Sequence, residues 1–464
     1  MTALFLGLYV LLQVGIAAWA ARGTKTDTDY LVAGRTLGVW QIAFSIFATW
    51  FAAETVIATS AEVASDGLAG ARVEPFGYAF GLVALGTFIA YRLRQEGHMT
   101  LASFLGSRFG PQVEIAAACF TALSATVWAA AQLSALAIIL SEATGLGVPL
   151  MLVASMAIVL VYAWVGGLKG DVITDVLQGA VIILVLLVLL FLVIDFAGGL
   201  GAAVAAIPEG ALSMRKEGES WLERIELWSL PILGTIVSQE VIARTLGAKS
   251  PETARRGTFL GAGIYLAIGM VPVLLGLVGP GLGLGLDGGD GYFTSLARTI
   301  LPAWLYVIIS GAMISAILSS VDSALLAVSA VATENGLVKL RPRSNGRQRL
   351  AMARFATAAA AVSAMAIAAA GDSIRAIVLT GEGIAGLLVL PVVVGLLVPG
   401  TGRVPVLAAL LVSLALTAWL DWISGTPGAF LFALAGGAMA FVLTRLVLMQ
   451  TSRFAGSPGS QEAP

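Results

Sequence analysis

The sequence contains few of the residues on which most enzyme active sites depend. Among its 464 residues there is one cysteine, Cys119, and one histidine, His98. Single residues of these types exclude a disulfide framework, a His/Cys metal cluster, and Ser-His-Asp or Cys-His catalytic sets. We therefore expect that the protein is not an enzyme.

Charge is scarce as well. Asp, Glu, Lys and Arg make up 11% of the chain and the formal net charge is −1, which argues against a nucleic-acid partner. Hydrophobic residues make up 58%, and several apolar runs exceed the roughly 20 residues that span a bilayer. The composition predicts an all-α polytopic membrane protein whose partners are the lipid bilayer, ions and a small-molecule solute.

Thirteen apolar segments are predicted to be transmembrane helices. They cover residues 4–21, 38–63, 72–93, 114–140, 147–165, 171–195, 224–243, 257–281, 301–332, 350–371, 374–399, 404–421 and 427–449. The first has the length of a signal peptide, but no basic residue precedes it and no clear small-residue cleavage site follows it. We therefore expect it to remain as a helix.

Lys and Arg residues are distributed unevenly between the predicted loops. None precedes the first span, whereas Arg22, Lys25 and Arg35 follow it, so the positive-inside rule places the N-terminus outside. An odd number of spans then places the C-terminus in the cytoplasm. This orientation leaves only six of the 26 basic residues outside: Arg72, Arg215, Lys216, Arg224, Arg298 and Arg375. The predicted location is the cell's inner (plasma) membrane.

Three loops and the tail are hydrophilic. Residues 196–223 and 282–300 form predicted outer loops, and each is expected to contain a short amphipathic helix. Residues 333–349 form the most basic inner loop, which fits contact with anionic lipid headgroups. We expect residues 450–464 to be disordered and no soluble domain to be appended.

The segment Ala316–Ser323 (AILSSVDS) places four polar side chains inside a predicted span, where polar groups are costly and usually serve an ion or a substrate. Ala316, Ser319 and Ser320 are spaced to share one helix face. They offer uncharged oxygen ligands, which suit a small hard cation such as Na⁺. Alternatively, each serine hydroxyl bonds to a carbonyl one turn earlier. Asp322 is expected to make contacts between helices.

A second polar stripe lies near the inner end of the span that begins at 171. It comprises Asp171, Thr174, Asp175 and Gln178, which share one helix face and could conduct a cation. The alternative is a helix cap, because Asp is favoured near a helix N-terminus. Glu240 and Arg244, four residues apart, are expected to form an ion pair.

Four motifs, in order along nearly the whole chain, resemble those of the sodium/solute symporter family. They are DYLVAGRTLGVWQIAFSIFATWFAAETVIATS (29–60), GGLKGDVITDVLQG (166–179), SQEVIARTLGAKSPETARRG (238–257) and AILSSVDS (316–323). The family includes sodium-coupled proline, pantothenate, sialic acid and sugar transporters, and it shares the leucine-transporter fold.

The resemblance implies how the predicted helices are organised. Residues 1–37 would hold an accessory helix and an inner loop, residues 38–399 a ten-helix core, and residues 400–449 two further helices. The core would consist of two inverted repeats, 38–195 and 224–399. In such folds the first helix of each repeat is interrupted where solute and ion bind. Pro231 and Gly234 predict the break in span 224–243; the break in span 38–63 is implied by the resemblance.

The resemblance also implies a sodium site. Its ligands would be the backbone carbonyls of Ala48, Phe51 and Ala316 and the hydroxyls of Ser319 and Ser320. Asp175 matches the family's carboxylate near the inward sodium path.

Candidate solute-binding residues lie around the same breaks. They are Glu54, Thr55, Trp128, Gln132, Gly234, Thr235 and Glu382. Glu54 could bind an ammonium group, or instead pair with a cation or cap the half-helix. Trp128 could equally pack against neighbouring helices. Gly234 and Thr235 stand where sugar-transporting relatives carry Tyr and Trp, so a stacked sugar is disfavoured.

The predicted function is sodium-coupled secondary active symport, importing a small polar organic solute by alternating access, with Na⁺ as the coupling ion. Glu54 favours an amino acid or another nitrogen-bearing metabolite. A monomer would suffice for transport. The alternative is a transporter-like membrane sensor that acts with a separate signalling partner.

Overall fold

The computed structural model describes residues 32–455 except Asp287 and Asp372, together with six residues between positions 7 and 19. Within this part the chain is helical and has no β-strand, only one isolated bridge between Leu37 and Ala248. The all-α prediction is therefore confirmed for the described residues. The remainder of the predicted span 4–21 and the residues beyond 455 lie outside them. Residues 450–455, which were expected to be disordered, are helical.

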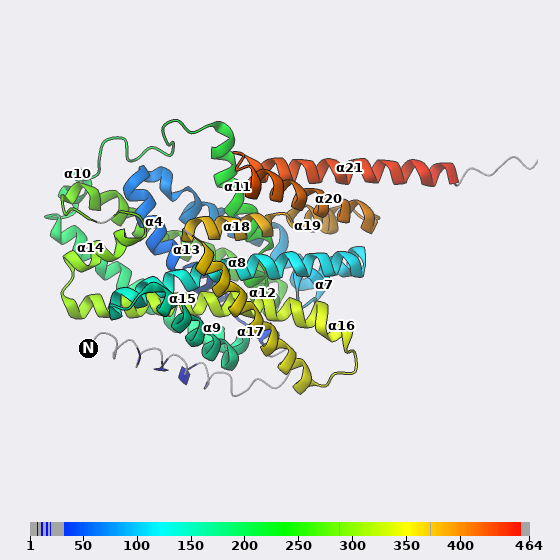
Figure 1. The fold of residues 1–464 in the computed structure, drawn as a ribbon, viewed down its shortest axis with the longest axis horizontal. Helices are drawn as coiled ribbons and strands as arrows, with labels where there is room; N and C mark the ends of the chain where they lie inside the picture. The colour runs from blue at the N-terminus through cyan, green and yellow to red at the C-terminus, as the bar shows by residue number, and fades with distance from the viewer. Residues whose placement is uncertain are drawn as a thin grey trace, which may run out of the picture.

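The helices are arranged as a bundle in which some long members run along the long axis of the view and others cross them obliquely (Figure 1). Their bounds are α3 (Val39–Trp50), α4 (Ala53–Asp66), α5 (Tyr78–Ala84), α6 (Ala90–Glu96), α7 (Leu101–Phe109), α8 (Pro111–Thr144), α9 (Val148–Phe196), α10 (Leu200–Ala205), α11 (Trp221–Val237), α12 (Gln239–Leu246), α13 (Pro251–Val278), α14 (Tyr292–Ile300), α15 (Ala303–Ala332), α16 (Val338–Leu340), α17 (Gly346–Ala370), α18 (Ile374–Gly386), α19 (Val389–Leu397), α20 (Arg403–Thr417) and α21 (Ala429–Ala455).

Ten helical stretches in the described residues are long and apolar enough to cross a membrane. Two shorter apolar stretches, Val39–Trp50 and Val148–Val161, accompany them, and the second is the first part of α9. Every predicted span after the first falls on helix. The predicted separation of 147–165 from 171–195 is not seen, because α9 is continuous helix across both. The total of thirteen spans remains a prediction.

Both expected interruptions are present. α3 ends at Trp50, Phe51 and Ala52 are not helical, and α4 begins at Ala53. The second break lies at Ser238, between α11 and α12, where ψ is 122°. The prediction that Pro231 and Gly234 cause this break is wrong.

Pro231 is accommodated inside α11 by its neighbours. Its ring packs against Gly77, where an added Cβ would come within 2.5 Å of the proline Cγ. A proline removes one helical hydrogen bond, but packing against adjacent helices allows a membrane helix to tolerate the proline. The helix continues past Pro231, and the chain leaves the helical conformation seven residues later, at Ser238.

α15 forms the centre of the bundle. Every residue from Ile309 to Val331 is buried, and the helix packs against α3, α8 and α9. A helix that is buried all round belongs to the interior of a large bundle. Ser319 and Ser320 therefore lie deep inside the protein, next to the break between α3 and α4.

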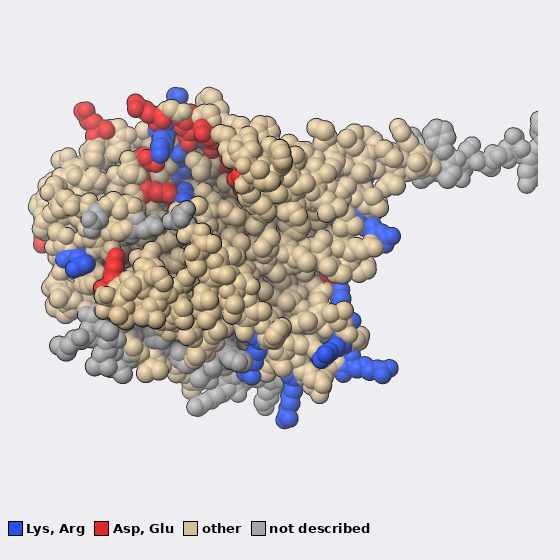
Figure 2. All heavy atoms as spheres, viewed as in Figure 1, with Lys and Arg blue, Asp and Glu red and all other residues tan. Residues whose placement is uncertain are grey.

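Short helices occur in both predicted outer loops. α10 lies in the loop 196–223 and α14 in the loop 282–300, and α14 packs against α4. In Figure 2 the acidic side chains gather at the end of the molecule that carries α10 and α14, and Lys and Arg dominate the opposite end, near α7 and α16 of Figure 1. The two ends therefore differ in charge as the positive-inside rule requires.

Labelling of single cysteines should establish the orientation. Cys119 is exposed, so it is first replaced by alanine. A cysteine at Leu340, which is 80% exposed, should then react with an impermeant maleimide only from the cytoplasmic side, and one at Ser213 only from outside, because the basic residues are retained inside. Reaction from the reversed sides would contradict the predicted orientation and the assignment of the repeats.

Candidate functional site

The break after α3 leaves backbone carbonyls without helical partners, and side-chain hydroxyls bind them instead. The Ser320 hydroxyl donates to the Thr49 carbonyl at 2.9 Å and lies 3.5 Å from the Ala48 carbonyl. The Thr55 hydroxyl donates to the Trp50 carbonyl at 3.0 Å. The carbonyl ends of α3 thus face the serine pair of α15.

The two serines of α15 have different partners. The Ser320 hydroxyl is also 3.1 Å from the Ala316 carbonyl. The same hydroxyl therefore bonds to the preceding turn of its own helix and to α3. Ser319 donates to the Asp175 carboxylate on α9. Of the predicted sodium ligands, Ala48, Ala316 and Ser320 are brought together. Phe51 lies at the break, with its ring buried 6.1 Å from that of Tyr265. Their binding of Na⁺ remains a prediction.

Asp175 is fully buried and joins three helices. Its carboxylate accepts hydrogen bonds from Ser45 of α3 and Ser319 of α15. α9 begins at Val148, so Asp175 lies in the middle of a helix and does not cap one. The structure thus excludes the helix-cap interpretation, and the role of Asp175 on an ion path remains a prediction.

Arg244 is the main residue that sequence reasoning misplaced. Its guanidinium is 1% exposed and reaches from α12 to Asp171 on α9, with an Nη2–Oδ2 distance of 2.5 Å. The predicted ion pair between Arg244 and Glu240 is wrong. The contact between these two residues is a hydrogen bond from Arg244 to the Glu240 backbone carbonyl, at 2.8 Å. The Glu240 carboxylate accepts a bond from Ser238 instead, at 2.5 Å. Nothing in the sequence marked Arg244, because it lies one residue beyond the predicted span 224–243.

Three buried carboxyl groups, Asp171, Asp175 and Asp322, share the field of this one guanidinium. Three of their oxygens have no hydrogen-bond partner among the described residues. They are both carboxylate oxygens of Asp322 and the Oδ1 of Asp171. Asp322, which was expected to make contacts between helices, is buried without a hydrogen bond that would join them. Ionising several buried carboxyl groups beside a single guanidinium is costly.

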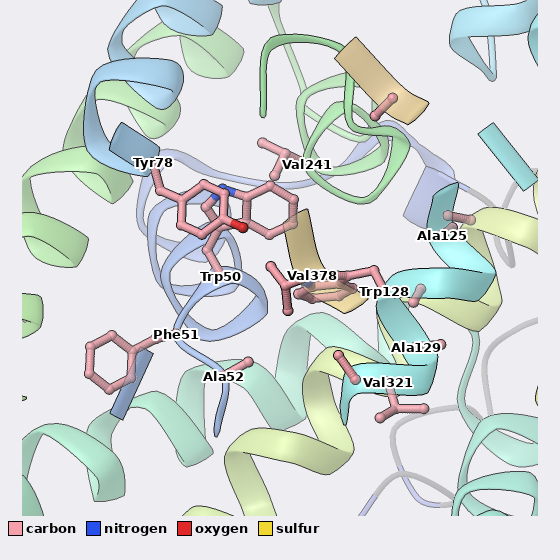
Figure 3. Close-up of a cluster of buried hydrophobic side chains, with 14 of the residues drawn as sticks. Trp50, Phe51, Ala52, Tyr78, Ala125, Trp128, Ala129, Val241, Val321 and Val378 are labelled. Atoms are coloured by element: carbon pink, nitrogen blue, oxygen red, sulfur yellow. The ribbon is translucent and has the colours of Figure 1, made fainter. Parts of the chain in front are cut away.

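Aromatic rings form a buried cluster beside the break (Figure 3). The ring centroid of Trp50 lies 5.4 Å from that of Trp128 and 5.6 Å from that of Tyr78. The Trp50 indole N–H donates to the Thr235 hydroxyl at 3.2 Å. Trp128 and Thr235 were predicted, but Trp50 and Tyr78 were missed because nothing in their local sequence distinguishes them from packing residues.

Glu382 of α18 adds a carboxylate to this cluster. It is 5% exposed, and the Tyr78 hydroxyl lies 3.3 Å from its Oε1. A Cβ on Gly234 would lie 1.8 Å from its Oε2. Gly234 therefore makes room for the carboxylate, which explains why no side chain stands there.

The other predicted solute residues are placed around this cluster. Gln132 is fully buried one turn after Trp128 on α8, and Thr55 lies 3.4 Å from the Tyr265 hydroxyl. Glu54 belongs to α4, but its side chain lies outside the described residues. Glu382 is therefore the buried carboxylate in the described structure that could bind a nitrogen-bearing solute.

A cavity of about 710 Å³ opens at the acidic end of the molecule. Its walls include Arg375 and Leu379 of α18 and Glu226 of α11. Glu382 follows Leu379 by three residues on α18, so it lies one turn deeper on the same helix face. A wall residue of the cavity and the Glu382 carboxylate thus lie on the same face of α18.

Residues 30–398 match the model of the sodium:solute symporter family. The chain belongs to this family. The family interpretation of the sequence is thereby confirmed, with Na⁺ as the ion that the family couples to.

The chain is similar to several named transporters. It is 30% identical over 359 residues to the human high affinity choline transporter 1, covering 70% of this chain and 60% of that protein. It is 25% identical over 351 residues to the sodium/pantothenate symporter of Escherichia coli K12, covering 72% of each. Against choline transporters of Caenorhabditis elegans and Drosophila melanogaster, the match spans 66% and 55% of their length.

Solved structures confirm the fold. A Na⁺-coupled sialic acid symporter in a substrate-bound, outward-open state aligns with a TM-score of 0.78 at 17% identity, covering 96% of both chains. The nucleobase-cation-symport-1 transporter MHP1 in a closed conformation aligns with a TM-score of 0.60, also at 17% identity. The protein is thus a multi-pass membrane protein with the leucine-transporter-like fold.

Proposed function

We propose that the protein is a sodium-coupled symporter that imports a small organic cation, either a quaternary ammonium compound or a protonated amine. The observation that carries this proposal is the cluster of Trp50, Tyr78 and Trp128 with the carboxylate of Glu382. Aromatic faces attract quaternary ammonium groups, each by about 0.5–2 kcal/mol. A buried carboxylate adds the opposite charge that such a solute needs.

The relatives support this solute class. Several of the most similar named proteins are choline transporters, and choline carries a quaternary ammonium group. The aromatic cluster is closed to solvent, because Trp50 is only 3% exposed and Trp128 only 5%. The rings must therefore part to admit the solute and can then enclose its methyl groups.

The charge of the cavity of about 710 Å³ at the acidic end also favours a cationic solute. Its lining includes seven acidic residues, Glu62, Asp66, Glu217, Glu219, Glu223, Glu226 and Asp421, against the three basic residues Arg72, Lys216 and Arg375. Each basic residue is already paired with one of these acids: Arg72 with Glu219, Lys216 with Asp66 and Arg375 with Glu62. The remaining negative charge would concentrate both Na⁺ and a cationic solute at the entrance.

Alternating access supplies the mechanism. We assign the repeats to residues 38–195 and 224–399, each beginning with a broken helix. Na⁺ bound between the α3 carbonyls and Ser319 and Ser320 would stabilise the outward-open state, and solute binding would then permit closure. Only a difference in affinity between the two states can drive such a change.

Uptake into proteoliposomes tests the proposal. Under an inward sodium gradient, labelled choline should accumulate, and tetramethylammonium should compete with it. Its neutral carbon analogue, 3,3-dimethyl-1-butanol, should not compete, because it has the same shape without the charge. The control replaces the sodium gradient by a potassium gradient.

Two results would contradict the proposal. Equal competition by the neutral analogue would remove the cation selectivity. Saturable binding of choline without sodium-driven accumulation would instead support the alternative of a membrane sensor.

A further inference from the structure

The Arg244 side chain lies where four helices meet. Its Nε donates to Ser45 of α3 at 3.1 Å, and its Nη2 donates to Ser323 of α15 at 2.5 Å. The same Nη2 lies 2.5 Å from Asp171 and 3.4 Å from Asp175, both on α9. The guanidinium is thus bound mainly to Asp171 but is within reach of Asp175.

Asp175 has a second group of neighbours. Ser319, a predicted sodium ligand, donates to one of its oxygens, and Ser45 donates to the other. Its Oδ2 is the oxygen nearest to Arg244. A cation that leaves the serine pair along α9 therefore meets a carboxylate that a guanidinium can also bind.

We propose that Arg244 is a positioning residue that competes with Na⁺ for Asp175 and so promotes release of the ion. Asp171 holds the guanidinium at a distance while Na⁺ shares Asp175. When the guanidinium takes Asp175, Na⁺ loses this ligand and leaves. The inference rests on the proposed sodium coupling.

The position of Arg244 on α12 connects this exchange to the transport cycle. α12 is the half-helix that follows the break at Ser238. A movement of this half-helix relative to α9 changes the distance from the guanidinium to both carboxylates. Because an arginine forms directional bonds to carboxylates, a small movement suffices to exchange one partner for the other.

Paired substitutions test the competition because they have opposite expected effects. Arg244→Gln removes the competitor, so the half-saturating sodium concentration should fall about tenfold, the equivalent of one charge-assisted hydrogen bond. The maximal uptake rate should fall as well, because release slows. Asp171→Asn frees the guanidinium for Asp175, so the half-saturating sodium concentration should rise about tenfold.

The double variant Asp171→Asn, Arg244→Gln keeps the net charge and avoids leaving Asp171 unpaired. It should bind Na⁺ more tightly than the wild type, because no guanidinium competes. A pure charge effect predicts wild-type affinity for this variant instead. Arg255→Gln is the control, since Arg255 is exposed on α13 and its guanidinium lies over the Tyr91 ring.

Sodium titration of the full-length protein in lipid nanodiscs, followed by tryptophan fluorescence, gives the affinities, and Trp50 beside the break is a suitable reporter. If both single variants shift the sodium affinity in the same direction, or the double variant matches the wild type, the inference is wrong while sodium coupling stands. A wild-type protein that shows no sodium response overturns both.

Discussion

Replacing Ser319 or Ser320 by alanine should raise the half-saturating sodium concentration for uptake by roughly 10- to 150-fold. Each substitution deletes one of the proposed oxygen ligands, a loss worth about 1.5–3 kcal/mol, and about 1.4 kcal/mol corresponds to a factor of ten. The double variant should be weaker still. Initial uptake rates measured against sodium concentration give these values.

The structure makes this test sharper, because both serines also have partners in the protein. Ser320 donates to carbonyls of α3 and lies near that of Ala316, and Ser319 donates to Asp175. If the hydroxyls only hold the helices together, the variants will unfold at lower temperature with an unchanged sodium curve. Ser363→Ala is the control: Ser363 is exposed on α17 and bonds only to the preceding turn. Solute binding at saturating sodium should change far less than sodium affinity.

Glu382→Gln should weaken solute binding by roughly 10- to 150-fold and leave the half-saturating sodium concentration nearly unchanged. The substitution keeps the shape of the side chain but removes the charge that pairs with the solute cation, worth about 1.5–3 kcal/mol. Competition by unlabelled choline at saturating sodium measures the loss.

The control for this variant is Glu209→Gln, which removes a carboxylate from an exposed loop position. A Glu382→Gln protein with wild-type choline competition would show that Glu382 does not contact the solute. Trp128→Phe should cause a smaller loss, because the phenyl face still attracts a cation but less strongly than an indole.

The amino-acid sequence already determined the class of the molecule. Long apolar runs cannot be solvated, so they must cross the bilayer as helices, and every predicted span within the described residues falls on helix. Ser319 and Ser320 could be singled out because a polar pair inside such a run is costly. The order of the four motifs was sufficient to indicate the family.

The tertiary structure decided where distant residues meet. Arg244 lies 73 positions from Asp171 along the chain, and its nearest carboxylate in sequence, Glu240, is bound to Ser238 instead. Packing against Gly77 accommodates Pro231 inside α11, and the second helix break lies at Ser238 instead. Trp50 and Tyr78 become candidates for solute contact only because the fold brings them together near Glu382. Helix periodicity specifies which face a side chain occupies, whereas the partner of that face depends on the packing of the whole bundle.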